Sequence, residues 1–168
     1  MMYAWQPEAL LHVAVWGLIA TAALSIVLQG SQGLGLSRLS LPFLIGTLFT
    51  GNRDRASIYG FLFYILGGWI FAFLYFLVLT SAQLHHWWFG TLVGGLHGLI
   101  LLVVIMPILP NIHPRIATEF DGPTSLRRLE PPGFMGLNYG RATPFSTVIG
   151  HMLYGAILGA ALPPAVWH

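Results

Sequence analysis

The chain contains no cysteine and no lysine, and only 7% of its 168 residues are charged. The lack of cysteine excludes disulfides, thiolate chemistry and cysteine-ligated metals, and the lack of lysine excludes Schiff-base catalysis. Soluble domains carry about 25% charged residues, so this chain has too little charge to cover a water-facing surface. A soluble globular enzyme is therefore excluded, and no catalytic residue or metal site is predicted.

Long apolar runs take the place of charge. Hydrophobic residues make up 56% of the chain and the mean hydropathy is +0.75. A helix needs about 20 mostly apolar residues to cross a bilayer, and the uncharged stretch 56–114 is long enough for two crossings. The sequence predicts an all-α integral membrane protein with one membrane domain over 1–168. Its four transmembrane helices are expected at about 9–29, 56–80, 88–109 and 145–161, with loops 30–55 and 110–144 on one side.

The distribution of arginine predicts an orientation. Every basic residue falls in one of the two longer loops: Arg38, Arg53 and Arg55 in the first, and Arg115, Arg127, Arg128 and Arg141 in the second. Because cytoplasmic loops retain Lys and Arg, we expect both loops to be cytoplasmic and both termini to lie outside. Tryptophans 5, 87, 88 and 167 fall at the expected outer boundary, where indole rings prefer to sit. The arginines form no continuous basic face, so nucleic-acid binding is not expected.

The two loops share a sequence pattern. The first contains Arg38-Leu39, Pro42, Gly46 and Arg55-Ala56, and the second contains Arg128-Leu129, Pro132, Gly136 and Arg141-Ala142 in the same order, with the first three at the same spacing and a gap before the last. Each pattern leads into a membrane helix. This predicts two helix-loop-helix repeats of like orientation, with the short apolar segments 41–50 and 133–140 lying along the inner interface or entering it packed on protein.

Small residues recur on one face of two predicted helices. Gly90, Gly94 and Gly98 repeat every four residues in the third helix, and Gly155 and Gly159 do so in the fourth. Such a ridge lets another helix approach closely. The pattern predicts tight helix packing, either within the chain or between copies or subunits.

Two histidines lie deep in the predicted crossings, namely His97 and His151. An ionisable group at that depth is a functional candidate, and the two imidazoles are candidate ligands for a b-type haem. The alternative is that they are neutral and hydrogen-bond to neighbouring carbonyls or hydroxyls. No acidic side chain lies in the second, third or fourth helix to orient an imidazole, so the expectation is that no cofactor is bound.

The second loop carries Arg115, Arg127 and Arg128, which are candidate contacts for a phosphate, an anionic lipid headgroup or a protein partner. The alternative is that these charges pair with acidic neighbours and hold a proline-stiffened loop in shape. His113, Glu119 and Asp121 match no metal-binding motif.

A longer set of residues carries a resemblance. It comprises Leu41-Pro42-Phe43-Leu44-Ile45-Gly46-Thr47, Asn52-Arg53-Asp54-Arg55-Ala56, Gly67-Gly68-Trp69, Leu96-His97-Gly98, Leu109-Pro110, His113-Pro114-Arg115 and Leu129-Glu130-Pro131-Pro132-Gly133-Phe134. In these the chain resembles a group of small bacterial multi-pass membrane proteins. The resemblance implies a bacterial inner-membrane location, but it carries over no activity and no site residue.

Three functions fit the sequence. The first is a non-catalytic membrane subunit that packs against and stabilises a larger membrane protein complex. It is indicated by the glycine faces, the long ordered-looking loop and the absence of intramembrane acids. The second is a small permeation or lipid-handling protein with an inner vestibule formed by 41–50 and 133–140. The third is a haem-binding protein that uses His97 and His151. The expected partners are bilayer lipid and either other membrane subunits or further copies of this chain.

Overall fold

The computed structural model describes residues 7–118 and 122–162, and these ranges are helical with no named strand. Four long helical spans are connected by segments that carry two short helices. The elements are α1 (Pro7–Gly33), α2 (Leu41–Gly46), α3 (Arg53–Ala82), α4 (Trp87–Ile100), the π-helical η1 (Leu101–Ile105), α5 (Met106–Ile112), the 3-10 helix η2 (Phe134–Tyr139) and α6 (Thr143–Ala161).

Four spans are long and apolar enough to cross a membrane: Glu8–Gly33, Arg53–Ala82, Trp87–Ile112 and Thr143–Ala161. The chain is therefore a multi-pass membrane protein, as predicted. Each span is longer than expected from the apolar runs, most clearly α3. It begins before Ala56, because the Asn52 side chain accepts from the Arg55 amide at 3.0 Å and caps the helix. At about 1.5 Å per residue α3 is roughly 45 Å long, so it must tilt or project beyond a hydrocarbon core of about 30 Å.

The third span changes its winding halfway. It runs as α4 to Ile100, as a wider π-helical turn through η1, and as α5 to Ile112. Pro107 and Pro110 lie just beyond the π turn and have no amide hydrogen to donate to the preceding turn. A local π-helical adjustment re-pairs backbone groups that proline leaves free.

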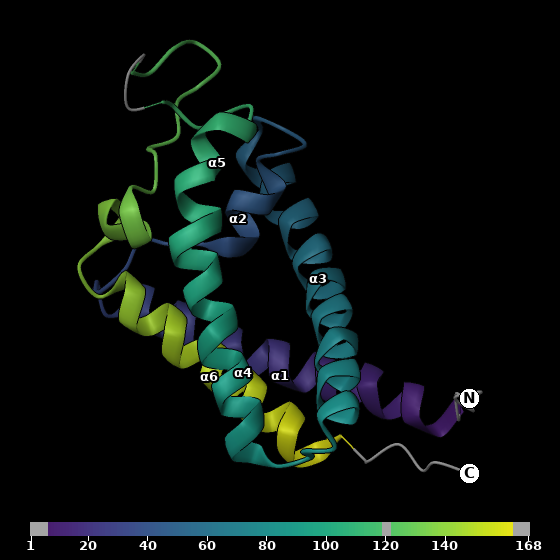
Figure 1. Cartoon of the computed structure of the whole chain (residues 1–168). Coiled ribbons are helices and arrows are strands. Elements are labelled where there is room, and N and C mark those ends of the chain that lie inside the picture. Colours follow the sequence, from purple (N-terminus) through teal and green to yellow (C-terminus); the bar gives the residue numbers. More distant parts are fainter. Residues whose placement is uncertain (1–6, 119–121, 163–168) are drawn as a thin grey trace.

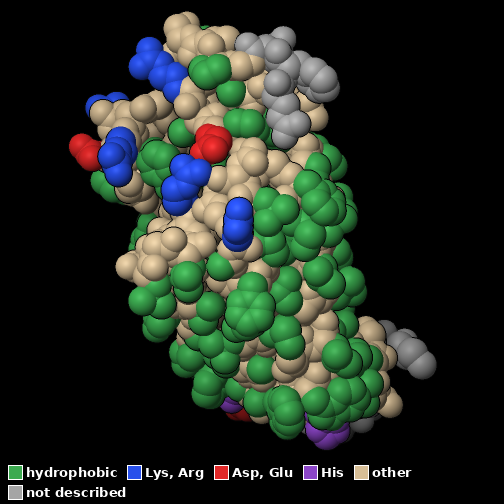
Figure 2. Space-filling view, turned by 90° about the vertical axis from the view of Figure 1, so that its left-hand side faces the viewer, with side chains coloured by type: hydrophobic (Ala, Val, Ile, Leu, Met, Phe, Trp, Pro, Cys, Tyr) green, Lys and Arg blue, Asp and Glu red, His purple; other side chains and the backbone are tan. Residues whose placement is uncertain are grey.

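The spans divide into two steep and two inclined helices. In Figure 1, α3 and the α4–α5 span run along the long direction of the molecule, whereas α1 and α6 cross it at an angle. The start of α1 and the end of α6 lie toward one end, and the segments around α2, η2 and residues 113–118 lie toward the other. Figure 2 shows arginine and acidic side chains gathered at that second end, above a surface covered by apolar side chains.

The apolar surface belongs to the membrane spans. Ile26 of α1, Phe61 of α3, Leu92 of α4 and Phe145 of α6 are each at least 59% exposed. Soluble proteins rarely expose apolar area this extensively, so lipid is the medium that suits it.

The glycine ridges of α4 and α6 pack against each other inside the chain. A Cβ built on Gly94 would lie 2.1 Å from the His151 carbonyl oxygen, and one on Gly155 would lie 2.0 Å from the Gly90 carbonyl oxygen. Gly98 and Gly159 are also in this seam, where backbones touch with no side chain between them. Of the packing modes that the glycine pattern predicted, the structure has the intramolecular one.

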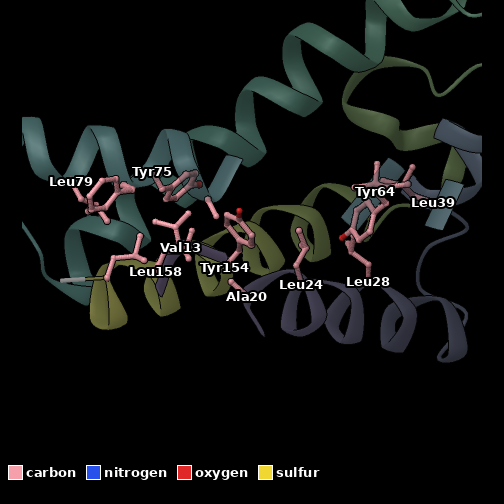
Figure 3. Packing of buried hydrophobic residues seen from close by; sticks show 14 of the residues in the cluster. Val13, Ala20, Leu24, Leu28, Leu39, Tyr64, Tyr75, Leu79, Tyr154 and Leu158 are labelled. Atoms are coloured by element: carbon pink, nitrogen blue, oxygen red, sulfur yellow. The ribbon is translucent and has the colours of Figure 1, made fainter. Parts of the chain in front are cut away.

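The apolar core lies where α1, α3 and α6 meet. Figure 3 shows Val13, Ala20 and Leu24 of α1 beside Tyr154 and Leu158 of α6, with Tyr75 and Leu79 of α3 above them. The Tyr154 hydroxyl donates to the Gly68 carbonyl at 2.7 Å, and the Tyr154 ring meets Tyr75 edge-on at 5.3 Å. These contacts hold the spans below the charged end, where the candidate site lies.

Candidate functional site

The charged end contains an open cleft of about 940 Å³. It is formed by the end of α1, the segment around α2, the start of α3 and the loop between α5 and η2. Four arginines line it, and none of the described lining residues is acidic. The lining comprises Gln32, Arg38, Ser40, Phe43, Thr47, Gly51, Arg53, Ser57, Arg115, Ser125, Leu126, Arg128 and Leu129. This density of positive charge and hydroxyl groups suits an anion that accepts several hydrogen bonds.

One wall of the cleft is formed by α2 and the start of α3, and helix caps and a contact between aromatic rings hold these two elements in place. The Ser40 hydroxyl accepts from the Phe43 amide at 3.4 Å and begins α2. Phe49, just after α2, stacks on Phe63 of α3 with ring centroids 4.4 Å apart. Arg53 then occupies the first turn of α3, where it is exposed. Its carbonyl accepts from the Ser57 hydroxyl at 3.0 Å, and its guanidinium has no hydrogen-bond or ion-pair partner in the part of the chain that the structure describes.

The opposite wall is the loop between α5 and η2, and its residues His113 and Arg115 hydrogen-bond to the segment around α2. The Arg115 guanidinium donates to the Thr47 and Leu48 carbonyls at 2.6 and 3.2 Å. His113 is buried, its Nδ1 accepts from the Arg115 amide at 3.1 Å, and its Nε2 donates to the Leu44 carbonyl at 3.1 Å. Burial lowers the pKa of His113, the Leu44 carbonyl opposes this shift, and the charge of Arg115 adds to it. His113 is therefore a neutral structural link at pH 7.

Arg38 joins the two loops at the outer edge of the cleft. Its guanidinium lies 3.0 Å from a Glu130 carboxylate oxygen and 2.5 Å from the Asn138 carbonyl oxygen. The ion pair is well exposed, with side chains 68% and 47% accessible, so its contribution to stability is small. The Tyr139 hydroxyl donates to the Glu130 carbonyl at 2.8 Å, and burial, followed by the charge of Glu130, raises the Tyr139 pKa to about 12.

A second, smaller cavity continues from the cleft between α1 and α3. Its volume is about 280 Å³, and it shares Gln32, Ser40, Phe43 and Ser57 with the cleft. Its remaining lining is mostly apolar or hydroxyl-bearing: Ser25, Leu28, Gln29, Leu41, Pro42, Phe61 and Tyr64. We call this cavity the α1–α3 groove. The groove lies between the polar cleft and the membrane-spanning parts of α1 and α3.

The structure brings only part of the predicted arginine set to this site. Arg115 and Arg128 line the cleft, whereas Arg127 is not among its lining residues and donates to the Pro110 carbonyl at 3.4 Å. Arg38 and Arg53 also line it but were not predicted as site residues. One signal for Arg38 was available, because it holds the place in the first loop pattern that Arg128 holds in the second.

His97 and His151 do come together, across the α4–α6 seam. Their ring centroids are 4.7 Å apart in an edge-on arrangement. His97 Nδ1 lies 3.3 Å from the Tyr75 hydroxyl, and the His151 Nδ1–H donates to the Thr147 carbonyl at 2.7 Å. Two axial ligands of one haem must lie on opposite faces of a flat macrocycle, and rings in direct contact leave no room for one. The pair instead makes hydrogen-bond contacts with Tyr75 of α3 and with the Thr147 carbonyl of α6.

No group of three His, Asp or Glu side chains in the described ranges is placed to hold a metal ion. Glu119 and Asp121 of the second loop lie outside those ranges. Comparison of the chain with protein-family models, with curated proteins and with solved structures gave no match.

Proposed function

We propose that this chain is a membrane protein that binds phosphate-bearing anions in the arginine-lined cleft, which is the binding step that the lipid-handling alternative needs. The observation that carries the proposal is the open cleft itself, with four arginines and no acidic side chain among its described lining. Guanidinium groups bind phosphate oxygens with two parallel hydrogen bonds, a geometry that ammonium groups lack. Arg53 supports the proposal further, because its guanidinium has no partner in the described part of the free protein.

The accessory-subunit function remains a second proposal with weaker support. The glycine ridges that suggested a protein partner are covered by one another within the chain, so they offer no free packing surface. The cleft, by contrast, is open. Copurification of a second protein in mild detergent would favour the subunit function.

The proposal includes a location and an orientation. We infer a bacterial inner membrane with the arginine end in the cytoplasm and both termini outside, because cytoplasmic loops retain arginine. The repeated loop pattern fits this proposal, since Arg38 and Arg128 both line the cleft. Anionic lipids of the cytoplasmic leaflet then lie at the same level as the cleft.

The orientation is testable because the chain has no native cysteine. We expect a single Ala82→Cys, exposed at the end of α3, to react in intact cells with a membrane-impermeant maleimide. A single Ser125→Cys, exposed in the arginine cleft, should react only after the cells are opened. The reverse labelling pattern would overturn the proposed orientation.

Anion binding is testable with glycerol 3-phosphate, which has no acyl chain, on protein purified in a non-ionic detergent. We expect binding to the native chain, and at least tenfold weaker binding to the Arg53→Gln/Arg128→Gln double variant, since each lost guanidinium removes charge-assisted hydrogen bonds. Arg55→Gln is the matched control: Arg55 lies in the same helical turn as Arg53 but does not line the cleft. Equal binding to the double variant, or none to the native chain, would contradict the proposal.

A further inference from the structure

We propose that the occupant of the cleft is an anionic glycerophospholipid, with its phosphate among the arginines and an acyl chain in the α1–α3 groove. This inference rests on the proposed anion binding and adds the identity of the ligand. It requires that the polar cleft and the apolar groove form one continuous site. The two cavities share four lining residues and therefore adjoin each other, which supports that continuity.

The site changes character with depth along α3. Arg53 and Ser57 lie at the polar end, whereas Phe61 and Tyr64 lie farther down the groove. At about 1.5 Å per residue, Ser57 is roughly 6 Å and Tyr64 roughly 16 Å from Arg53 along the helix. The lining thus changes from guanidinium groups to hydroxyl-bearing and apolar side chains, as a phospholipid changes from its phosphate through its ester groups to hydrocarbon.

A buried hydroxyl in the groove lacks a well-formed hydrogen bond. The Tyr64 side chain is 7% exposed, and its hydroxyl has the Ser25 hydroxyl as a neighbour but no well-formed hydrogen bond among the described residues. Buried polar groups nearly always have a partner, and leaving one unpaired is costly. Figure 3 shows Tyr64 beside Leu28 of α1, another residue that lines the groove. An ester carbonyl of a lipid in the groove would accept from this hydroxyl.

The charge of the cleft selects among lipids. Four arginines attract a headgroup of net negative charge, such as that of phosphatidylglycerol, and repel the quaternary ammonium of phosphatidylcholine. We therefore expect dioleoylphosphatidylglycerol to bind at least tenfold more tightly than dioleoylphosphatidylcholine in native mass spectrometry of the detergent-solubilised protein. It should also bind at least tenfold more tightly than glycerol 3-phosphate, because its acyl chain adds apolar contact.

Two variants test the groove apart from the arginines. Gln29→Trp adds bulk at a groove-lining position, and Gly30→Trp adds the same bulk next to it, where a Cβ would meet open space. We expect Gln29→Trp to weaken phosphatidylglycerol binding at least tenfold, with glycerol 3-phosphate binding unchanged and Gly30→Trp behaving as the native chain. Tyr64→Phe, which removes only this hydroxyl, should keep the fold and weaken lipid binding severalfold.

The outcomes separate this inference from the proposed function. Glycerol 3-phosphate binding that depends on Arg53 and Arg128, with phosphatidylglycerol binding no more tightly, would overturn the lipid and keep the anion site. Lipid binding unaffected by both Gln29→Trp and Tyr64→Phe would overturn the groove as the acyl-chain site. Binding of neither probe would overturn the proposed function itself.

Discussion

Replacing Gly94 with alanine is expected to destabilise the whole helix bundle. The added Cβ would lie 2.1 Å from the His151 carbonyl oxygen, and the next nearest atoms also belong to the α6 backbone. Backbone cannot rotate aside as the end of a side chain can, so α4 and α6 must separate along their seam. Overpacking of this kind costs about 1–3 kcal/mol and occasionally more. Because the added Cβ would meet backbone atoms of α6, we expect Gly94→Ala to lower the free energy of unfolding by about 3 kcal/mol.

Gly95→Ala is the matched control for that experiment. Its Cβ would meet only the Met152 side chain, at an ordinary 3.5 Å, and alanine favours a helix over glycine by roughly 0.5–1 kcal/mol. Both variants are compared with the native chain by denaturation in mixed detergent micelles, followed by circular dichroism. Equal stability of the Gly94→Ala and Gly95→Ala variants would contradict the seam as the structure has it.

The number of spans could be predicted from the sequence, but the way in which they pack could not. The apolar runs predicted four spans, which the structure confirms, because the thickness of a bilayer imposes a minimum length on each of them. The spacing of Gly90, Gly94 and Gly98 predicted a close contact but not its partner, since a ridge of small residues fits any matching surface. The π-helical turn at η1 was not predicted, although Pro107 and Pro110, which lack the amide hydrogens of a regular helix, follow it directly in the sequence.

The candidate site was predictable only in part, for a different reason. Arg115 and Arg128 could be named because they lie in one long loop, but Arg38 and Arg53 come from another segment. Whether these arginines share a cleft depends on how the two loops are fastened, through His113 to Leu44 and through Arg115 to Thr47. Such contacts between distant segments have no periodic signal in a single sequence. The Tyr64 hydroxyl likewise becomes informative only once its burial is known.

Replacing Gly60 with leucine is expected to abolish the cleft while leaving the four spans folded. A Cβ on Gly60 would lie 1.9 Å from the Pro42 carbonyl oxygen of α2, and a Cβ on Gly46 would lie 1.7 Å from the Ala56 carbonyl oxygen of α3. The two helices thus touch backbone to backbone at both glycines. Leucine at position 60 must push α2 off α3, and α2 carries part of the cleft lining, including Phe43.

This loss should stay local, because α2 is a six-residue helix that packs chiefly on α3 and contributes only Leu41 to the buried core cluster. We expect Gly60→Leu to lose at least tenfold in glycerol 3-phosphate affinity and to speed amide hydrogen exchange over residues 41–50, with the helical content retained. Gly67→Leu, on the same helix but facing open space, should match the native chain in both measurements. Unchanged binding by Gly60→Leu would mean that the position of α2 against α3 does not shape the cleft, whereas loss of helical content would mean that α2 supports the bundle as well as the site.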